Sequence, residues 1–110
     1  MFDASFYQNV LPGWVRTQCE ARPQQIPVVE LRLADATTLD VCHIVHLADR
    51  WLSVAYFRDS AVCADMAMAF IGYEMVTRVT LSLHDPKARR LGFSVAKSEE
   101  ATAPGTPGRA

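Results

Sequence analysis

Cysteine is scarce in this sequence of 110 residues and forms no recognisable pattern. The three cysteines are Cys19, Cys42 and Cys63, an odd number without the Cys-x-x-Cys spacing of zinc ribbons and redox motifs. Neither a disulfide framework nor a zinc ribbon is therefore expected. The simple interpretation is a cytoplasmic protein whose cysteines are reduced.

Strong charge and long apolar runs are missing as well. The formal net charge is -1 at pH 7, so the composition gives no global electrostatic reason to expect a nucleic-acid partner. No apolar run approaches the roughly 20 residues that a membrane helix needs. Residues 1–5 show no basic region leading into an apolar stretch. We therefore expect neither a signal peptide nor a membrane association.

Catalytic and metal-binding signatures are also absent from the sequence. There is no glycine-rich phosphate loop, and no serine or cysteine stands near a recognisable base. His43 and His46 are three residues apart, which on a regular strand places them on opposite faces. They are then unable to bind one metal ion together. We therefore expect no enzymatic activity, no metal ion and no cofactor.

The sequence does contain three strand-like segments joined by very short turns. They cover residues 28–33, 39–47 and 51–57, and apolar side chains alternate along each of them. In the middle segment, strict alternation places Val45 on the main apolar face and Ile44 on the opposite face. This meander is typical of the first half of a small, strongly bent barrel, and such barrels are more often binding modules than enzymes.

A helix is expected before the first strand. Ser5 fits the N-cap of a capping box, and apolar residues at helical spacing follow it. Pro12 interrupts this pattern, so the segment is either one helix that starts near Pro12 or two short helical pieces, ending before Pro23. Trp14 is large and apolar, and we expect it to pack against an open end of the barrel or a partner chain.

Further strand signals follow the meander. Residues 66–71 are interpreted as a fourth strand, residues 72–75 as a tight turn, and residues 76–83 as a β-branched fifth strand. Residues 89–95 allow a short sixth strand that pairs back on the fifth. Residues 97–110 contain no large apolar side chain and are rich in Pro, Gly and Thr, which predicts a disordered tail.

Two of these stretches resemble the sequence motifs of the Sm/LSm family, which includes the bacterial RNA chaperone Hfq. Residues 28–57 are similar to the first motif, with acidic turns at Asp35 and Asp49 between alternating strands. Residues 70–79 are similar to the second motif, a strand, a tight turn and a strand. With the helix, the resemblance covers residues 5–83. It implies a barrel whose fourth and fifth strands are open edges that pair between subunits into a ring.

The sequence departs from the family at positions that bear on RNA binding. Sm proteins usually have a glycine after the acidic residue of the first turn, where this chain has Ala36. The Hfq type has a Tyr-Lys-His triplet in the second motif, whose lysine and histidine contact uridine-rich RNA. The triplet here is Tyr73-Glu74-Met75, so a carboxylate would face phosphate. The resemblance therefore supports the ring-forming barrel more than it supports RNA binding.

The predicted fold is mainly β, a small five-stranded, strongly bent SH3-like or Sm-like barrel with an N-terminal α-helix and room for a short sixth strand. Residues 1–96 form this barrel domain, and residues 97–110 form the tail. Two functions stay open. The first is an oligomeric Sm-like ring that binds RNA or another polyanion. The second is a protein-interaction or structural module on the same barrel that has lost RNA binding, which Glu74 and the near-zero charge favour.

Two sets of candidate residues follow from these hypotheses. The RNA-contacting candidates combine one aromatic ring with nearby cations: Tyr73, Arg78, Lys87, Arg89 and Arg90. The candidates for the interface of a homo-oligomeric ring are apolar residues of the fourth and fifth strands: Met66, Met68, Phe70, Val76 and Val79. The RNA-contacting set has plain alternatives, since Tyr73 could pack against Met75 or a neighbouring subunit, and the basic turn at residues 87–90 could be a solvated hairpin tip.

Overall fold

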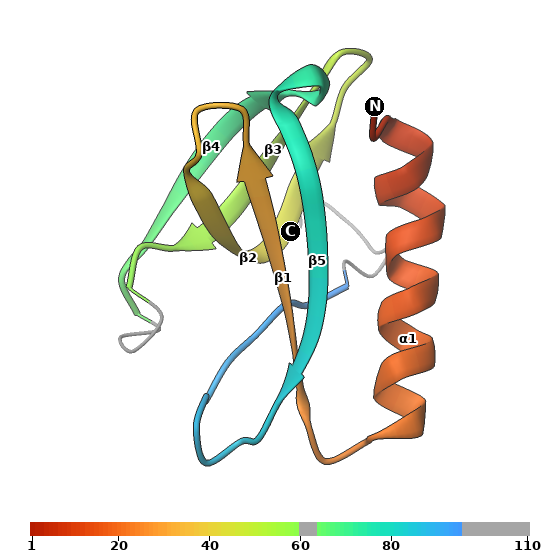
Figure 1. The fold of residues 1–110 in the computed structure, drawn as a ribbon, viewed down its shortest axis with the longest axis vertical. Helices are drawn as coiled ribbons and strands as arrows, with labels where there is room; N and C mark the ends of the chain where they lie inside the picture. Colours follow the sequence, from red (N-terminus) through yellow and green to blue (C-terminus); the bar gives the residue numbers. More distant parts are fainter. Residues whose placement is uncertain (60–63, 96–110) are drawn as a thin grey trace, which may run out of the picture.

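An N-terminal helix and a five-stranded antiparallel sheet make up the protein in the computed structural model, which describes residues 1–59 and 64–95 (Figure 1). The elements in chain order are a π-helical turn η1 (Phe6–Val10), α1 (Leu11–Ala21), β1 (Ile26–Leu33), β2 (Thr38–Leu47), β3 (Trp51–Phe57), β4 (Met66–Gly72), a 3₁₀ turn η2 (Tyr73–Met75) and β5 (Val76–His84). The expected helix and five strands are confirmed. The expected tail, residues 97–110, lies outside the described residues.

The hydrogen-bonding pattern of the helical segment changes from π-helical to α-helical near Pro12. Pro12 has no N–H to donate, and the wider π-helical turn η1 ends at Val10, two residues before it. The predicted cap is wrong: Ser5 is already helical, and Asp3 accepts the Phe6 N–H at 3.1 Å instead. Trp14 is 58% exposed, so the described chain leaves most of its surface uncovered. No helix within the described residues is long and apolar enough to cross a membrane.

The strands follow the order β4-β3-β2-β1-β5, and each hydrogen-bonded neighbour is antiparallel. Among the described strands, no pairing joins β4 to β5, so hydrogen bonds do not close the sheet into a barrel. Strands β4 and β5 are consequently the two free edges, and their unpaired backbone groups are available to another strand.

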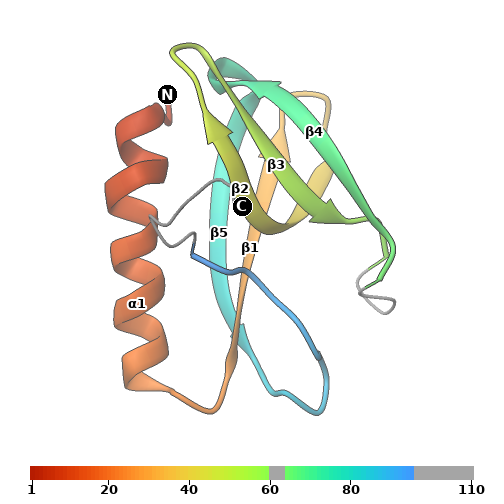
Figure 2. The same cartoon turned by 180° about the vertical axis from the view of Figure 1, so that it is seen from behind.

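One face of the sheet, here called the inner face, holds the core and is flanked by α1 (Figures 1 and 2). Val29 and Leu31 from β1 and Leu52 and Val54 from β3 are at most 2% exposed on this face. Leu11 and Val15 are buried on α1 and belong to the same cluster of apolar side chains. The helix therefore supplies the second layer that this apolar face needs.

Two β-bulges in β2 change which side chains reach the core. The pairing with β3 shifts between Val41 and His43 and again between Ile44 and His46, so strict alternation fails in this strand. Ile44 packs against the core, while Val45 is 48% exposed. The predicted assignment of these two side chains is wrong, because each bulge adds one residue and moves the following side chains to the other face.

The segment after β5 contradicts the predicted sixth strand. Within the described residues no strand follows β5; instead the chain turns back and crosses β1 toward the helix (Figures 1 and 2). The Phe93 N–H donates to the Pro27 carbonyl at 2.8 Å, and the Ser94 N–H donates to the Cys42 carbonyl at 2.7 Å. A Cβ at Gly92 would lie 2.0 Å from the Pro27 oxygen, so only glycine fits there. This segment, residues 85–95, is called the strap.

The first turn of the meander has a backbone conformation that is usually adopted by glycine. Ala36 has a φ of 73°, in the left-handed region that is unfavourable for a residue with a Cβ. The Asp35 side chain accepts hydrogen bonds from the backbone N–H and the hydroxyl of Thr37, which hold the turn. These bonds lower the pKa of Asp35 below its usual range. Ala36 therefore adopts the positive φ for which Sm proteins usually have a glycine at this position.

Candidate functional site

The face of the sheet opposite the core, here called the outer face, is covered over β1 and β2. Arg89 of the strap forms an ion pair with Asp40 at 2.6 Å, and these side chains are only 9% and 10% exposed. The Arg89 guanidinium lies 5.4 Å from the ring centroid of Phe57, which is itself buried. The Arg89 Nε also donates to the Leu91 carbonyl at 2.7 Å. This part of the outer face is therefore closed.

The outer face over β4 carries bare apolar side chains instead. Met66, Met68 and Phe70 alternate along β4 and are 38%, 52% and 67% exposed. The alternate residue Ile71 points to the core and is 6% exposed. An exposed apolar strip on an edge strand is the arrangement that leads to strand pairing between molecules. The strip is consequently the first candidate interaction surface.

A row of aromatic rings extends this strip onto the neighbouring strands. The rings of His46 and Trp51 are 5.6 Å apart, and those of Trp51 and Phe70 are 5.8 Å apart at 60°. Gly72 lies directly opposite Trp51, and the Glu74 carboxylate is 3.7 Å from the place a Cβ of Gly72 would occupy. We call Trp51, Phe70 and Glu74 the aromatic–acid patch.

Sequence reasoning does not include Trp51 or Glu74 among the candidate binding residues. The signal that could identify Trp51 is the apolar character of both faces of β3, since one of these faces needs a cover outside the core. The place of Glu74 depends on how η2 folds back over Gly72, and no local pattern predicts that fold.

The aromatic ring expected to stack on RNA is buried. Tyr73 is 2% exposed, donates its hydroxyl to the Ala48 carbonyl at 2.6 Å, and stacks on Tyr7 of η1 with centroids 5.8 Å apart. Burial raises the pKa of Tyr73, and the charges of Asp3 and Asp49 add to the rise. Tyr73 thus packs inward, and its partner is Tyr7 rather than the expected Met75 or a neighbouring subunit.

The expected cations do not form one basic surface. Arg89 is enclosed by its ion pair with Asp40, whereas Lys87 and Arg90 are exposed in the turn after β5. Arg78 is exposed on β5 and lies directly opposite Arg32 of β1. Within the described chain, the guanidinium groups of Arg78 and Arg32 make no ion pair or hydrogen bond.

The five expected interface residues fall into two groups. Met66, Met68 and Phe70 are exposed together on β4, as described above. Val76 is 5% exposed in the core cluster, and Val79 packs against that cluster from the inner face of β5. Their side chains therefore contact the core of their own chain, and only the backbone edge and the outer side chains of β5 face away from it.

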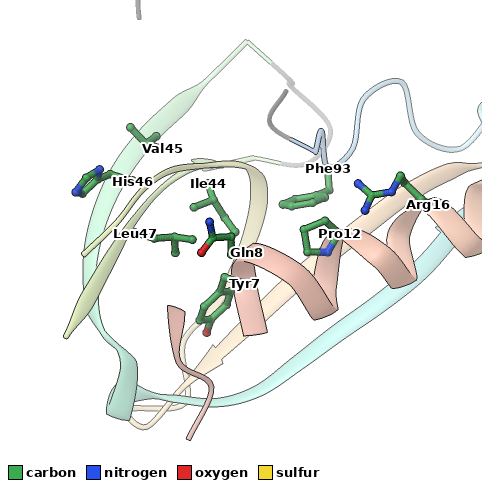
Figure 3. A pocket seen from close by; sticks show the side chains of 9 residues that line it. All are labelled: Tyr7, Gln8, Pro12, Arg16, Ile44, Val45, His46, Leu47 and Phe93. Atoms are coloured by element: carbon green, nitrogen blue, oxygen red, sulfur yellow. The ribbon is translucent and has the colours of Figure 1, made fainter. Parts of the chain in front are cut away.

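A pocket of about 510 Å³ lies between the N-terminal helical segment and β2 (Figure 3). Much of its lining is apolar and includes Pro12 and Phe93. Its polar lining residues are Gln8, Arg16 and His46, and all of these are exposed. Figure 3 shows Arg16 and His46 at opposite ends, so the residues that line the pocket provide no converging set of polar groups for chemistry.

The histidine and cysteine cluster of β2 does not follow the predicted arrangement. His43 and His46 pair with Ala55 and Ser53, which lie two residues apart on β3, so the bulges bring both histidines to one face. The His43 Nδ1 lies 3.4 Å from the Cys42 sulfur. Among residues 1–59 and 64–95, no group of three or more His, Cys, Asp or Glu side chains is close enough to hold a metal ion.

Comparison with known proteins gives no relative for this chain. No family model matches the sequence, and neither a curated protein nor a solved structure matches it at a significant level. The order of one helix and five antiparallel strands is consistent with an Sm-like fold. The exposed strip of β4 and the aromatic–acid patch are therefore the features on which a function can be based.

Proposed function

We propose that this chain is an Sm-like, self-assembling interaction module. In this assembly the β4 edge of one copy pairs with the β5 edge of the next copy, and no catalytic step is involved. The observation that supports it is the exposed strip of Met66, Met68 and Phe70 on a free strand edge. Such an edge needs a cover to avoid uncontrolled aggregation.

The two edges make a head-to-tail interface, because different strands of each copy meet. A head-to-tail interface generates a ring when the rotation between copies closes. The ring is the homo-oligomer that the resemblance to Sm proteins implies. Antiparallel pairing adds backbone hydrogen bonds to the apolar burial, and both terms favour assembly.

Sedimentation velocity tests the assembly. The wild-type chain is expected to sediment as a multiple of 12.2 kDa. Met68→Glu puts a charge in the apolar strip, and we expect it to weaken association at least about tenfold. Val45→Glu is the matched control, because Val45 is 48% exposed on β2 away from the free edges. A wild-type monomer at several hundred micromolar would overturn the proposal.

RNA binding by the same assembly is a second candidate, and one observation favours it. Arg32 and Arg78 are two exposed arginines directly opposite each other on neighbouring strands, and such paired positive charges attract phosphate. Arg78, Lys87 and Arg90 are the expected contacts that stay accessible. Against it stand the burial of Tyr73 and the ion pair of Arg89.

Fluorescence anisotropy with labelled oligo-U and oligo-A at two salt concentrations separates the two candidates. Micromolar binding that weakens as salt rises supports the RNA candidate, because phosphate contacts release counterions. No binding of either oligomer at tens of micromolar, together with a wild-type oligomer, leaves the interaction module as the function.

A further inference from the structure

We infer that Arg78 of one copy docks on the aromatic–acid patch, Trp51, Phe70 and Glu74, of the next copy. The inference rests on the proposed self-assembly. It names a side-chain contact that would make the β4 edge of one copy specific for the β5 edge of the next. It assigns a role to an exposed cation and to an exposed acid, neither of which has a partner in the described chain.

The patch has the chemistry that a guanidinium group prefers. Trp51 and Phe70 are 40% and 67% exposed, and their rings meet edge to face with centroids 5.8 Å apart, so a cation can lie against the exposed ring surface of either one. The Glu74 carboxylate lies over Gly72, directly opposite Trp51 in the sheet. Arginine stacks on aromatic rings and binds carboxylates with two parallel hydrogen bonds, which lysine cannot do.

Both sides of the proposed contact have unbalanced charge in the single copy. Arg78 lies directly opposite Arg32, and like charges in this position repel each other. Within the described residues, the Glu74 carboxylate makes no ion pair or hydrogen bond. Bringing Arg78 to Glu74 relieves the repulsion on one edge and balances the acid on the other. This charge complementarity favours a second copy as the occupant of the patch.

The directions of the strands make the contact geometrically consistent. Phe70 is on the outer face of β4, and Arg78 is on the outer face of β5, because it pairs with the outer residue Arg32. Antiparallel pairing of the two strands continues one face of the sheet into the next. It also sets the end of β4, where the patch lies, against the beginning of β5, where Arg78 lies.

Charge reversal in mixtures tests the contact. Glu74→Arg and Arg78→Glu are each expected to weaken self-association by about tenfold or more, because each places like charges across the interface. An equimolar mixture of the two variants should assemble again, because every interface between unlike variants then joins opposite charges. At one such interface the two substituted side chains meet, and at the other the native Glu74 meets the native Arg78. Glu20→Arg makes the same charge change on an exposed part of α1 and should assemble like the wild type.

Sedimentation velocity measures all of these samples, and circular dichroism checks that each variant is folded. Restored assembly in the mixture supports the contact. If the wild type forms an oligomer but both single variants assemble normally, this inference is overturned and the self-assembly stands. The same holds if the mixture of the two variants fails to assemble. A wild-type monomer overturns the self-assembly, and the inference fails with it.

Discussion

The outer face of the sheet has two regions that the chain treats in opposite ways. Over β1 and β2 the strap covers the sheet, with Arg89 bound to the buried Asp40. Over β4 the sheet is bare, and Phe70 exposes 67% of its surface. The strap therefore covers one region of the outer face. The other region is open to a partner, which in our proposal is a second copy.

The two regions differ in what their side chains contribute: those of the covered region stabilise the fold, and those of the bare region are free to bind a partner. The covered region combines the ion pair of Arg89 and Asp40 with backbone hydrogen bonds of the strap, which are contacts within one chain. The bare region makes few contacts of this kind at its outward side chains. Substitutions in the covered region should therefore lower the free energy of unfolding, whereas substitutions in the bare region should change association.

The largest expected effect is in the covered region. Arg89→Ala should lower the free energy of unfolding by about 3 kcal/mol, because it removes the cation from a buried carboxylate. Arg90→Ala is the matched control, since Arg90 is exposed, and it should change stability by less than about 0.5 kcal/mol. Urea unfolding measures both. Equal effects of the two substitutions would show that the strap is not held by this ion pair.

Two stacked tyrosines in the core, Tyr7 and Tyr73, allow a second comparison with smaller expected effects. Tyr73→Phe should lower the free energy of unfolding by about 1 kcal/mol, because the hydroxyl donates to the Ala48 carbonyl. Tyr7→Phe should raise it by up to about 1 kcal/mol, because the Tyr7 hydroxyl is buried without a partner among the described residues. Urea midpoints that move in the same direction for both variants contradict this account.

The same two tyrosines predict a loss of stability at high pH. Burial raises the pKa of Tyr7, with a smaller contribution from Tyr73, and burial also raises the pKa of Tyr73. The folded chain then keeps protons that the unfolded chain releases. The stability is thus complete below about pH 10 and falls as the pH rises above that value. Urea midpoints at rising pH should fall less steeply in Tyr7→Phe than in the wild type, and parallel curves would be inconsistent with this cause.

A still smaller effect is expected at the first turn, which lies outside both regions. Ala36→Gly should raise the free energy of unfolding by about 0.5–1 kcal/mol, because it removes the Cβ from a backbone with positive φ. Ala34→Gly in the same turn provides the control and should lower it. Thermal unfolding distinguishes them, and a destabilised Ala36→Gly would mean that the turn favours alanine for another reason.

The strands are predictable because their signals are local. Alternation and β-branched residues identify β1, β3 and β5, and the methionines and alanines of β4 are identified as a strand by their place between strand signals. The bulges in β2 are not predictable, because no glycine marks Cys42 or Val45. A pattern of alternation contains no information on where a strand gains a residue.

The strap and the patch escape prediction because they depend on contacts between distant residues. Arg89 and Asp40 are 49 positions apart, and only the fold shows that they form an ion pair. The same holds for Tyr73, whose burial depends on Tyr7 of the helical segment. Met66, Met68 and Phe70 are exposed together on β4, and their place in an interface between copies stays a prediction.

Amide hydrogen exchange at low and high protein concentration tests the central claim most directly, namely that β4 of one copy pairs with β5 of another. We predict that peptides from Met66–Gly72 and Val76–His84 gain protection as the concentration rises, while peptides from Thr38–Leu47, in the interior of the sheet, stay unchanged. Exchange in β4 and β5 that is independent of concentration across this range would contradict the claim.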